Sequence, residues 1–317
     1  MRTYKIAFVG LGSIGKRHLK NLTDILLKRG EDFVIDAYRS SLAKELPSDI
    51  KSLLTNEYLL SKQLPPDTSY DMVFITNPTS MHWDTIQTFK GHTKSFFIEK
   101  PVFDRTDVEE ELLPKGSDTI CYVACPLRYN PVLQYVKNNI NCEKVYSARA
   151  ISSSYLPDWR PGIDYRQCYS AHRNMGGGVG IDLIHEWDYL TYLFGMPLIN
   201  YSIQDKISHL EIDSDDIAVY IAKTQNTTIE LHLDYFGRES VRILDLFMSD
   251  DTVHCDLLNG RIDYLKSKKS IVFDKERNYY QIIEIEHFLD IVSRKIDNDS
   301  DILHAIAVLK LAKGESL

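Results

Sequence analysis

Short apolar runs separated by helix-length segments dominate the first 125 residues. The first run is Ile6-Ala7-Phe8-Val9, and further strand-like runs follow at 33–38, 71–76, 95–98 and 120–124. A short apolar run bounded by turn residues is typical of a strand that is buried on both faces. After the first run, apolar residues recur at helical spacing from Ile14 to Leu26. Strands that alternate with helices predict an α/β fold, with a doubly wound domain around a parallel sheet.

The pattern changes after Pro126. Helical spacing is found at 132–140, after a Gly176-Gly177-Gly178 run, and at 284–295 and 300–313. Alternating segments at 145–155, 216–223, 228–235, 241–249 and 252–257 are typical of strands. They predict a second α/β domain with an antiparallel or mixed sheet. We therefore expect a first domain at 1–125 and a second domain at 126–317.

Composition and charge narrow the class of protein. The chain has 317 residues, of which 44% are hydrophobic and 26% charged, which suits two globular domains. A net charge of -8 disfavours nucleic acid or anionic lipid as the main partner. No apolar run is long enough for a membrane span, and no signal peptide is recognisable. Five cysteines without a C-x-x-C pair predict reduced thiols, no metal site and a cytoplasmic location.

A complete G-x-G-x-x-G motif follows the first strand and opens the first helix. In such a motif the first glycine allows the tight turn and the second lets the backbone approach a pyrophosphate. The third glycine lets helix and strand pack closely, while the helix N-terminus attracts the phosphates. A glycine-rich turn without a ligand is the alternative, but the strand-to-helix context argues against it. We expect a dinucleotide to bind at Gly10, Gly12, Ser13, Ile14 and Gly15.

The end of the second strand indicates which dinucleotide binds. NAD-specific sites place a carboxylate there for the ribose hydroxyls, whereas a 2'-phosphate requires a basic residue. Here the tip contains Arg39 and Ser40, and Asp36 lies two residues before Tyr38, inside the strand. NADP is therefore favoured, with NAD possible. The alternative is that Arg39 is only a solvated surface charge.

Two further segments contain reactive side chains. Glu99-Lys100-Pro101 follows a buried strand, and a lysine at that edge of a parallel sheet points into the ligand crevice. A helix that begins near Gly180 would place Asp182, His185 and Tyr189 on one polar face. A solvated face is the usual explanation of such a set. A zinc-protease H-E-x-x-H motif is excluded, because Tyr189 stands where the second histidine is needed.

These motifs occur in an order that resembles the glucose-fructose oxidoreductase / inositol dehydrogenase (Gfo/Idh/MocA) family. The resemblance includes the glycine motif, residues 76–82, Glu99-Lys100-Pro101 and the Gly-Gly-Gly helix, and it extends to 232–235. It implies an N-terminal Rossmann domain and a C-terminal α/β domain. In this family the large, open, mainly antiparallel sheet of the second domain commonly forms an oligomer interface. A homodimer or homotetramer is therefore expected.

The resemblance also implies the site residues. The family's catalytic lysine and Asp/His pair map onto Lys100, Asp182 and His185. The cofactor contacts implied by the same motifs are Asn77, Pro78, His82, Glu99 and Lys100.

One departure from the family pattern concerns the Asp/His pair. The family more commonly has three residues between them, and here only two intervene. The sequence around them looks like a subgroup often associated with surface-polysaccharide and unusual-sugar pathways. Asp188 is therefore an alternative to Asp182 as the helper of His185.

Together these features predict an NAD(P)-dependent oxidoreductase acting on a secondary alcohol or ketone of a sugar-type substrate. His185 would take or return the hydroxyl proton, and Lys100 would hydrogen-bond the same oxygen. Asp182 would orient the imidazole. The alternatives are an NADP-dependent reductase of a non-sugar substrate and a non-catalytic dinucleotide-sensing protein on the same fold.

The polar, aromatic segment before the Gly-Gly-Gly run is the candidate substrate loop. Aromatic rings can lie against sugar faces, and guanidinium groups suit carboxylates or phosphates. We expect an anionic substrate, such as an acidic or nucleotide-linked sugar, contacted by Arg160, Tyr165 and Arg166. Arg128, after the last strand of the first domain, is a weaker candidate. A solvated surface loop is the alternative.

Overall fold

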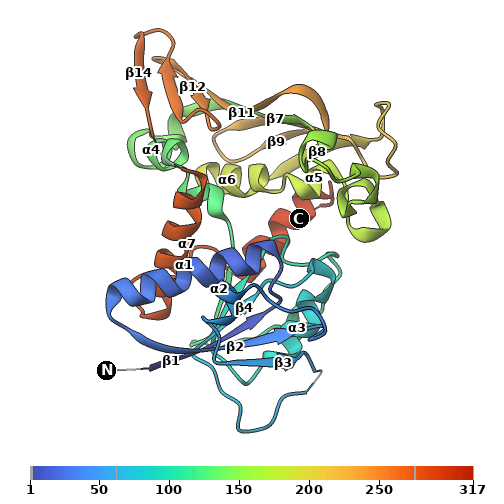
Figure 1. The fold of residues 1–317 in the computed structure, drawn as a ribbon. Coiled ribbons are helices and arrows are strands. Elements are labelled where there is room, and N and C mark those ends of the chain that lie inside the picture. The colour runs from blue at the N-terminus through green and yellow to red at the C-terminus, as the bar shows by residue number, and fades with distance from the viewer. Residues whose placement is uncertain (1–2, 62, 117, 275, 317) are drawn as a thin grey trace. The chain divides into compact units, whose positions relative to one another are not determined.

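The computed structural model describes residues 3–61, 63–116, 118–274 and 276–316. They form two compact units, and Figure 1 shows the ribbon with many of the strands and helices labelled. The first unit consists of Met1–Pro126 and Arg277–Ile306, and the second of Leu127–Glu276 and Ala307–Leu317. No helix in the described part of the chain is both long and apolar enough to cross a membrane.

The first unit contains a parallel sheet in the order β3-β2-β1-β4-β5-β6. The chain reverses its direction of winding between β1 and β4, which is where doubly wound sheets bind their ligands. The predicted Rossmann-type sheet is confirmed, although β3 was not predicted. The strands are β1 (Thr3–Val9), β2 (Asp32–Arg39), β3 (Asn56–Leu59), β4 (Met72–Ile75), β5 (Ser95–Ile98) and β6 (Ile120–Val123).

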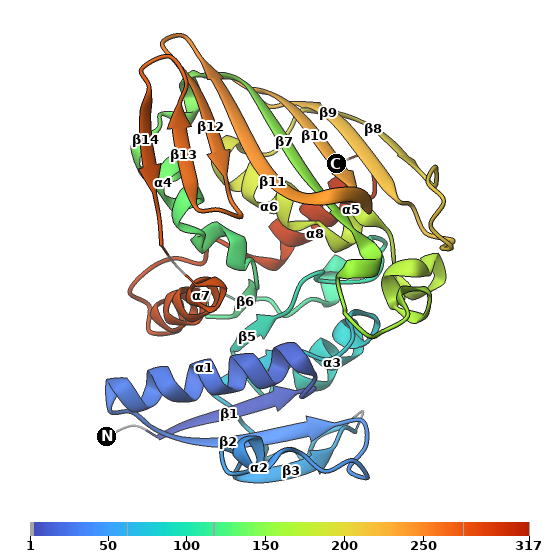
Figure 2. The same cartoon turned by 45° about the horizontal axis from the view of Figure 1, so that its top comes forward.

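Two helices distant in sequence pack together on one face of this sheet. They are α1 (Ser13–Arg29) and α7 (Arg277–Val292), which lie side by side in Figure 2. Phe288 of α7 meets Phe74 and Phe97 of the sheet edge-to-face, with ring centroids 5.6 and 5.3 Å apart. On the other face, Phe89 of α3 (His82–Phe89) packs on Tyr38. The short α2 (Ser48–Lys51) contributes the buried Ile50.

The position of α7 differs from the predicted division of the chain at residue 126. The structure assigns Arg277–Ile306 to the first unit, because α7 buries apolar side chains in the Rossmann core. Polar contacts also join α7 to α1, since Asn21 and Asn278 exchange amide hydrogen bonds of 3.1 and 3.2 Å. Helical spacing predicted this helix but could not show which core its apolar face would enter.

The second unit contains an open sheet in the order β14-β13-β12-β11-β7-β10-β9-β8. All neighbouring strands are antiparallel except β7 and β10, so the predicted mainly antiparallel sheet is confirmed (Figure 2). β8, β13 and β14 were not predicted. The strands are β7 (Val145–Tyr155), β8 (Ile199–Asp205), β9 (Ile217–Lys223), β10 (Thr228–Asp234), β11 (Phe236–Met248), β12 (Thr252–Asp256), β13 (Arg261–Tyr264) and β14 (Lys269–Val272).

The two faces of this sheet differ. Helices α5 (Val179–Asp182) and α6 (His185–Phe194) pack on one face, where Trp187 meets Tyr220 edge-to-face at 5.3 Å. The unit also contains α4 (Pro131–Asn139) and the C-terminal part of α8 (Ile302–Ala312). On the opposite face, near the β8 edge, apolar side chains are exposed. They are Ile199, Tyr201, Ile203 and Ile221, and we call them the β8–β9 apolar patch.

Candidate active site

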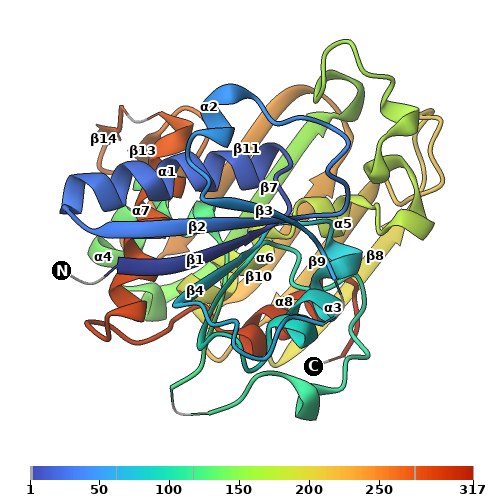
Figure 3. The same ribbon diagram turned by 60° about the horizontal axis from the view of Figure 1, so that its bottom comes forward.

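The glycine loop joins β1 to α1 at the carboxyl edge of the parallel sheet (Figure 3). Gly10 has a φ of +91°, and a Cβ there would lie 2.6 Å from the backbone of Asn77, so no other residue fits. A Cβ on Gly12, in contrast, would meet nothing within 4 Å. No side chain caps α1, and its first turn carries no acidic residue. The N-terminal amides of α1 are therefore available to a phosphate, as a dinucleotide site requires.

Asn77 follows β4 beside this loop. Its amide nitrogen donates to the Thr85 hydroxyl at 2.8 Å, while its side-chain oxygen is buried without a hydrogen-bond partner among the described residues. A donor group on a bound dinucleotide would satisfy this oxygen. Beneath Asn77, the imidazole of His82 lies 3.0 Å from the Asn77 carbonyl and 3.1 Å from that of Val102. Burial lowers the pKa of His82, and the ring holds the turn by lying between these two carbonyl groups.

At the end of β2, the side chain of Arg39 is bound by other protein groups. A guanidinium nitrogen of Arg39 lies 2.6 Å from the Glu57 carboxylate on β3, and another donates to the Lys44 carbonyl. Asp36 is already engaged, because it accepts hydrogen bonds from the Tyr70 hydroxyl at 2.9 Å and from an amide of Asn56. Ser40 is exposed. Sequence reasoning missed Glu57, since the strand that carries it was not predicted.

Lys100 follows β5, the neighbour of β4, and its backbone is held by the preceding glutamate. One oxygen of the Glu99 carboxylate lies 2.5 Å from His18 of α1, and the other accepts the Lys100 amide at 3.2 Å. Burial raises the pKa of Glu99. The hydrogen bond from His18 and the charges of His18, Lys100 and His82 outweigh this effect, so the pKa lies below its usual value. The carboxylate is therefore ionised and directed toward α1.

The predicted continuous helix from Gly180 is wrong. α5 ends at Asp182, and α6 begins only at His185. The solvated face, which is the usual explanation of such a set, is also excluded, because Asp182 is 7% exposed and Tyr189 is fully buried, whereas His185 is half-buried. Glu186 of the same helix is also buried and has a partner on the sheet, because Arg242 of β11 pairs with it at 2.6 Å.

Asp182 is held by tyrosine hydroxyls. Tyr235, between β10 and β11, donates to its carboxylate at 2.5 Å, and Tyr169 makes a second hydrogen bond. Burial and the adjacent carboxylate raise the pKa of both tyrosines well above the usual value, so both remain donors at neutral pH. Sequence reasoning did not assign them to the site. The 232–235 motif was a usable signal for Tyr235, and Tyr169 had none.

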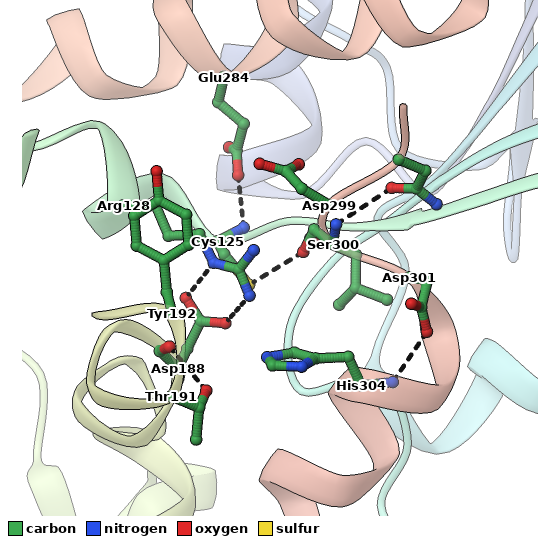
Figure 4. A network of polar contacts seen from close by, with 12 residues as sticks. Cys125, Arg128, Asp188, Thr191, Tyr192, Glu284, Asp299, Ser300, Asp301 and His304 are labelled. Atoms are coloured by element: carbon green, nitrogen blue, oxygen red, sulfur yellow. Dashed lines mark hydrogen bonds and ion pairs between the residues drawn. The ribbon is translucent and has the colours of Figure 1, made fainter. Parts of the chain in front are cut away.

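Asp188, the alternative helper, lies in a different environment. Arg128 donates to its two carboxylate oxygens at 2.9 and 2.6 Å, and Figure 4 shows both bonds. Both side chains are buried, and the guanidinium also lies over the ring of Tyr192. Because this pair satisfies both partners, Asp188 and Arg128 fit a structural role better than contact with a substrate.

The two arginines of the candidate substrate loop differ in their ion pairing. Arg166 pairs with Asp164 and with Glu211, each at 2.9 Å, so its charge is neutralised locally. Arg160 has no carboxylate within 4 Å among the described residues, and its guanidinium lies over the ring of Tyr169 at 5.8 Å. Tyr165 accepts a hydrogen bond from the Glu211 amide at 3.2 Å. Arg160 is therefore connected to Asp182 through Tyr169.

Each unit thus contains some of the predicted site residues close together. In the first unit, the glycine loop, Asn77 and Lys100 follow the neighbouring strands β1, β4 and β5. In the second unit, Arg160 and Asp182 share Tyr169. The described residues contain no group of three or more His, Cys, Asp or Glu side chains that could hold a metal ion.

Comparison with known proteins identifies the first unit. Residues 4–113 match the model of the GFO_IDH_MocA family, described as "Oxidoreductase family, NAD-binding Rossmann fold". The matched segment runs from β1 to beyond β5 and includes the glycine loop, Asn77 and Lys100. The prediction of an NAD(P)-dependent oxidoreductase is confirmed at this level.

Curated relatives are distant. The chain is 25% identical over 190 residues to "Uncharacterized oxidoreductase YrbE" of Bacillus subtilis (strain 168), a match to 59% of this chain. The match spans only about half, 52%, of that relative's length. A second relative, "scyllo-inositol 2-dehydrogenase (NAD(+))" of the same organism, is 22% identical over 91% of this chain and 86% of its own length.

A solved structure shares the whole fold. It is UDP-N-acetylglucosamine 3-dehydrogenase GnnA from Acidithiobacillus ferrooxidans, with a TM-score of 0.74. It is 18% identical, and the match covers 99% of this chain and 96% of that one. The likeness confirms the two-part α/β architecture. Residues 4–113, about a third of the chain, are therefore similar to the NAD-binding Rossmann domain of the Gfo/Idh/MocA oxidoreductase family.

Proposed function

We propose that the protein transfers a hydride between a nicotinamide dinucleotide and a secondary alcohol or ketone of a sugar or sugar derivative. The carboxyl edge of the parallel sheet carries this proposal. There the open position at Gly12, the uncapped N-terminus of α1 and the unpartnered oxygen of Asn77 fit a dinucleotide, and Lys100 follows the next strand. The names of the inositol and UDP-sugar dehydrogenases support a sugar-type substrate.

The chain's own residues handle the substrate oxygen and its proton. When bound, the nicotinamide supplies the hydride chemistry. The Lys100 ammonium hydrogen-bonds the substrate oxygen and stabilises negative charge on it. His185 takes or returns the hydroxyl proton, as a group whose unperturbed pKa lies near neutrality can. Asp182, held by Tyr235 and Tyr169, orients or polarises the imidazole.

Removing either reacting group should abolish turnover but not folding. Lys100→Ala and His185→Ala should each lose about 10²-fold or more in kcat, as expected for deletion of a proton-handling group. Steady-state kinetics with NAD(P) and a sugar panel measure the loss, and thermal melting measures stability. Asp182→Asn should lose less, because its role is orientation.

Surface variants of the same residue types provide the controls. Lys94→Ala and His254→Ala remove exposed or half-exposed partners of Asp118 and Asp245 and should keep parental kcat. Parental turnover in Lys100→Ala or His185→Ala, with the dinucleotide still bound, would favour the dinucleotide-sensing alternative. A larger catalytic loss at a folded Asp188→Asn than at Asp182→Asn would move the helper role to Asp188.

We further propose that NADP binds better than NAD. Arg39 and Ser40 stand at the tip of β2, where Glu57 offsets part of the positive charge of Arg39. Arg39→Ala should weaken NADP binding by about 1.5–3 kcal/mol and leave NAD nearly unchanged. Glu57→Gln should tighten NADP binding, because it removes the competing carboxylate. Fluorescence titration of both dinucleotides measures this, and equal losses for both in Arg39→Ala would refute it.

The substrate is proposed to be anionic, with Arg160, Tyr165 and Arg166 as contacts. Because Arg166 is neutralised by Asp164 and Glu211, Arg160→Ala should have the larger effect. We expect it to raise KM for acidic or nucleotide-linked sugars about tenfold, the cost of one charge-assisted contact. A panel that includes neutral sugars and inositols tests this. Efficient turnover of neutral sugars, unaffected by either arginine variant, would remove the loop from the site.

The protein is proposed to be a homodimer or homotetramer that associates through the β8–β9 apolar patch. Tyr201 and Ile203 of this patch are 70% and 71% exposed, and a contiguous apolar surface of this kind marks an interface. Ile203→Asp should lower the mass measured by light scattering after gel filtration. Leu27→Asp, at an equally apolar exposed site on α1, should not. A monomeric parent protein would contradict the proposal.

A further inference from the structure

His18 is a fully buried imidazole on α1, one turn after Gly15. Its Nε2 lies 2.5 Å from Oε1 of Glu99, and its ring meets Phe97 of β5 edge-to-face, with centroids 5.0 Å apart. A buried polar group of this kind requires partners, and Glu99 is the partner that the structure gives it. His18 therefore joins α1 to the segment that follows β5.

Glu99 transmits this contact to the catalytic lysine. Its backbone amide continues the sheet by donating to the Ile75 carbonyl at 2.9 Å. Its second carboxylate oxygen, Oε2, accepts the backbone amide of Lys100 at 3.2 Å. One carboxylate thus binds α1 on one side and the Lys100 backbone on the other. The direction in which the Lys100 side chain leaves the strand edge depends on this bridge.

We propose that His18 is a positioning residue for Lys100 and acts through the Glu99 carboxylate. The inference rests on the proposed function, in which Lys100 hydrogen-bonds the substrate oxygen. His18 has no role of its own in the reaction, because the ring is buried and its only described polar contact is Glu99.

The hydrogen-bonding state of His18 follows from its surroundings. Nδ1 is buried and has no hydrogen-bond partner among the described residues. The ionised Glu99 carboxylate can only accept, so Nε2 of His18 is the donor in the hydrogen bond between them. With His18 as the donor, the Glu99 carboxylate cannot rotate without losing the bond.

Loss of His18 should also change the titration of Glu99. The titratable groups that face this carboxylate are His18 of α1, His82 of α3 and Lys100 on its own segment. Burial raises the pKa of Glu99, and the His18 hydrogen bond is the largest of the effects that lower it. Without His18, Glu99 takes up a proton at higher pH and the Lys100 amide loses an anionic acceptor.

The decisive variant is His18→Leu, measured for kcat, dinucleotide Kd, melting temperature and pH profile. We expect kcat to fall about tenfold, as a misplaced catalytic group causes, while the dinucleotide Kd stays parental. The acid limb of the kcat profile should move to higher pH. His18→Gln, which keeps an N–H donor at similar reach, should recover most of kcat and of the parental profile.

Two comparisons separate positioning from general damage. Adding His18→Leu to Lys100→Ala should cause no further loss of kcat if His18 acts through Lys100. The control is His287→Leu, because His287 of α7 is a histidine of the same unit that pairs with a different carboxylate, that of Asp299, at 2.8 Å. It should keep parental kcat and pH profile.

The outcomes distinguish this inference from the proposed function. Parental kcat and pH profile in His18→Leu, with Lys100→Ala inactive, would overturn the positioning role alone. Additive losses in the double variant would also overturn it. Parental turnover in Lys100→Ala would instead refute the proposed catalytic role of the lysine. If His18→Leu does not fold, His18→Gln decides, since a tenfold loss there would show that the N–H donor is insufficient and contradict the inference.

Discussion

The close approach of three backbone segments at the carboxyl edge of the parallel sheet determines the rest of the first unit. Gly10 and Gly15 have no side chains, so the loop after β1 lies directly against Asn77 and Thr76 at the end of β4, and the Thr76 hydroxyl donates to the Gly10 carbonyl at 2.5 Å. This contact fixes the start of α1. The helix amides are consequently open to a phosphate, and His18 is carried to β5.

The second unit obeys a different constraint, which is the cost of burying charge. α6 carries Glu186 and Asp188 inward, and each is paired with an arginine from another element, Arg242 or Arg128. Removing one member of such a pair leaves a buried charge without compensation, which is strongly destabilising. The pairs therefore hold the helix against its surroundings and make its position specific. Asp182 accepts hydrogen bonds from the hydroxyl groups of Tyr235 and Tyr169.

The sequence predicted those parts of the structure that depend on residues close together in the chain. The glycine motif, its strand and its helix were predictable because the turn itself demands glycine at Gly10. The buried polar face of α5 and α6 was not predictable, since helical spacing cannot distinguish a solvated carboxylate from one paired with a distant residue. The same limit applies to Glu57 on β3 and to α7, whose partners are separated from them by many residues in the chain.

In these long-range pairs, a residue from one element holds a proposed site residue of another element in place. Three polar residues proposed for the site have such a partner. Glu57 pairs with Arg39, and tyrosine hydroxyls donate to Asp182. Glu99, itself bound by His18, accepts the backbone amide of Lys100. A long side chain loses conformational entropy when it is ordered, and a partner that orders it before binding removes that cost from the binding step. The partners also differ in charge, because Glu57 offsets part of the positive charge of Arg39, whereas the tyrosine hydroxyls that bind Asp182 are neutral donors. The partner residues thus tune the site without touching the ligand.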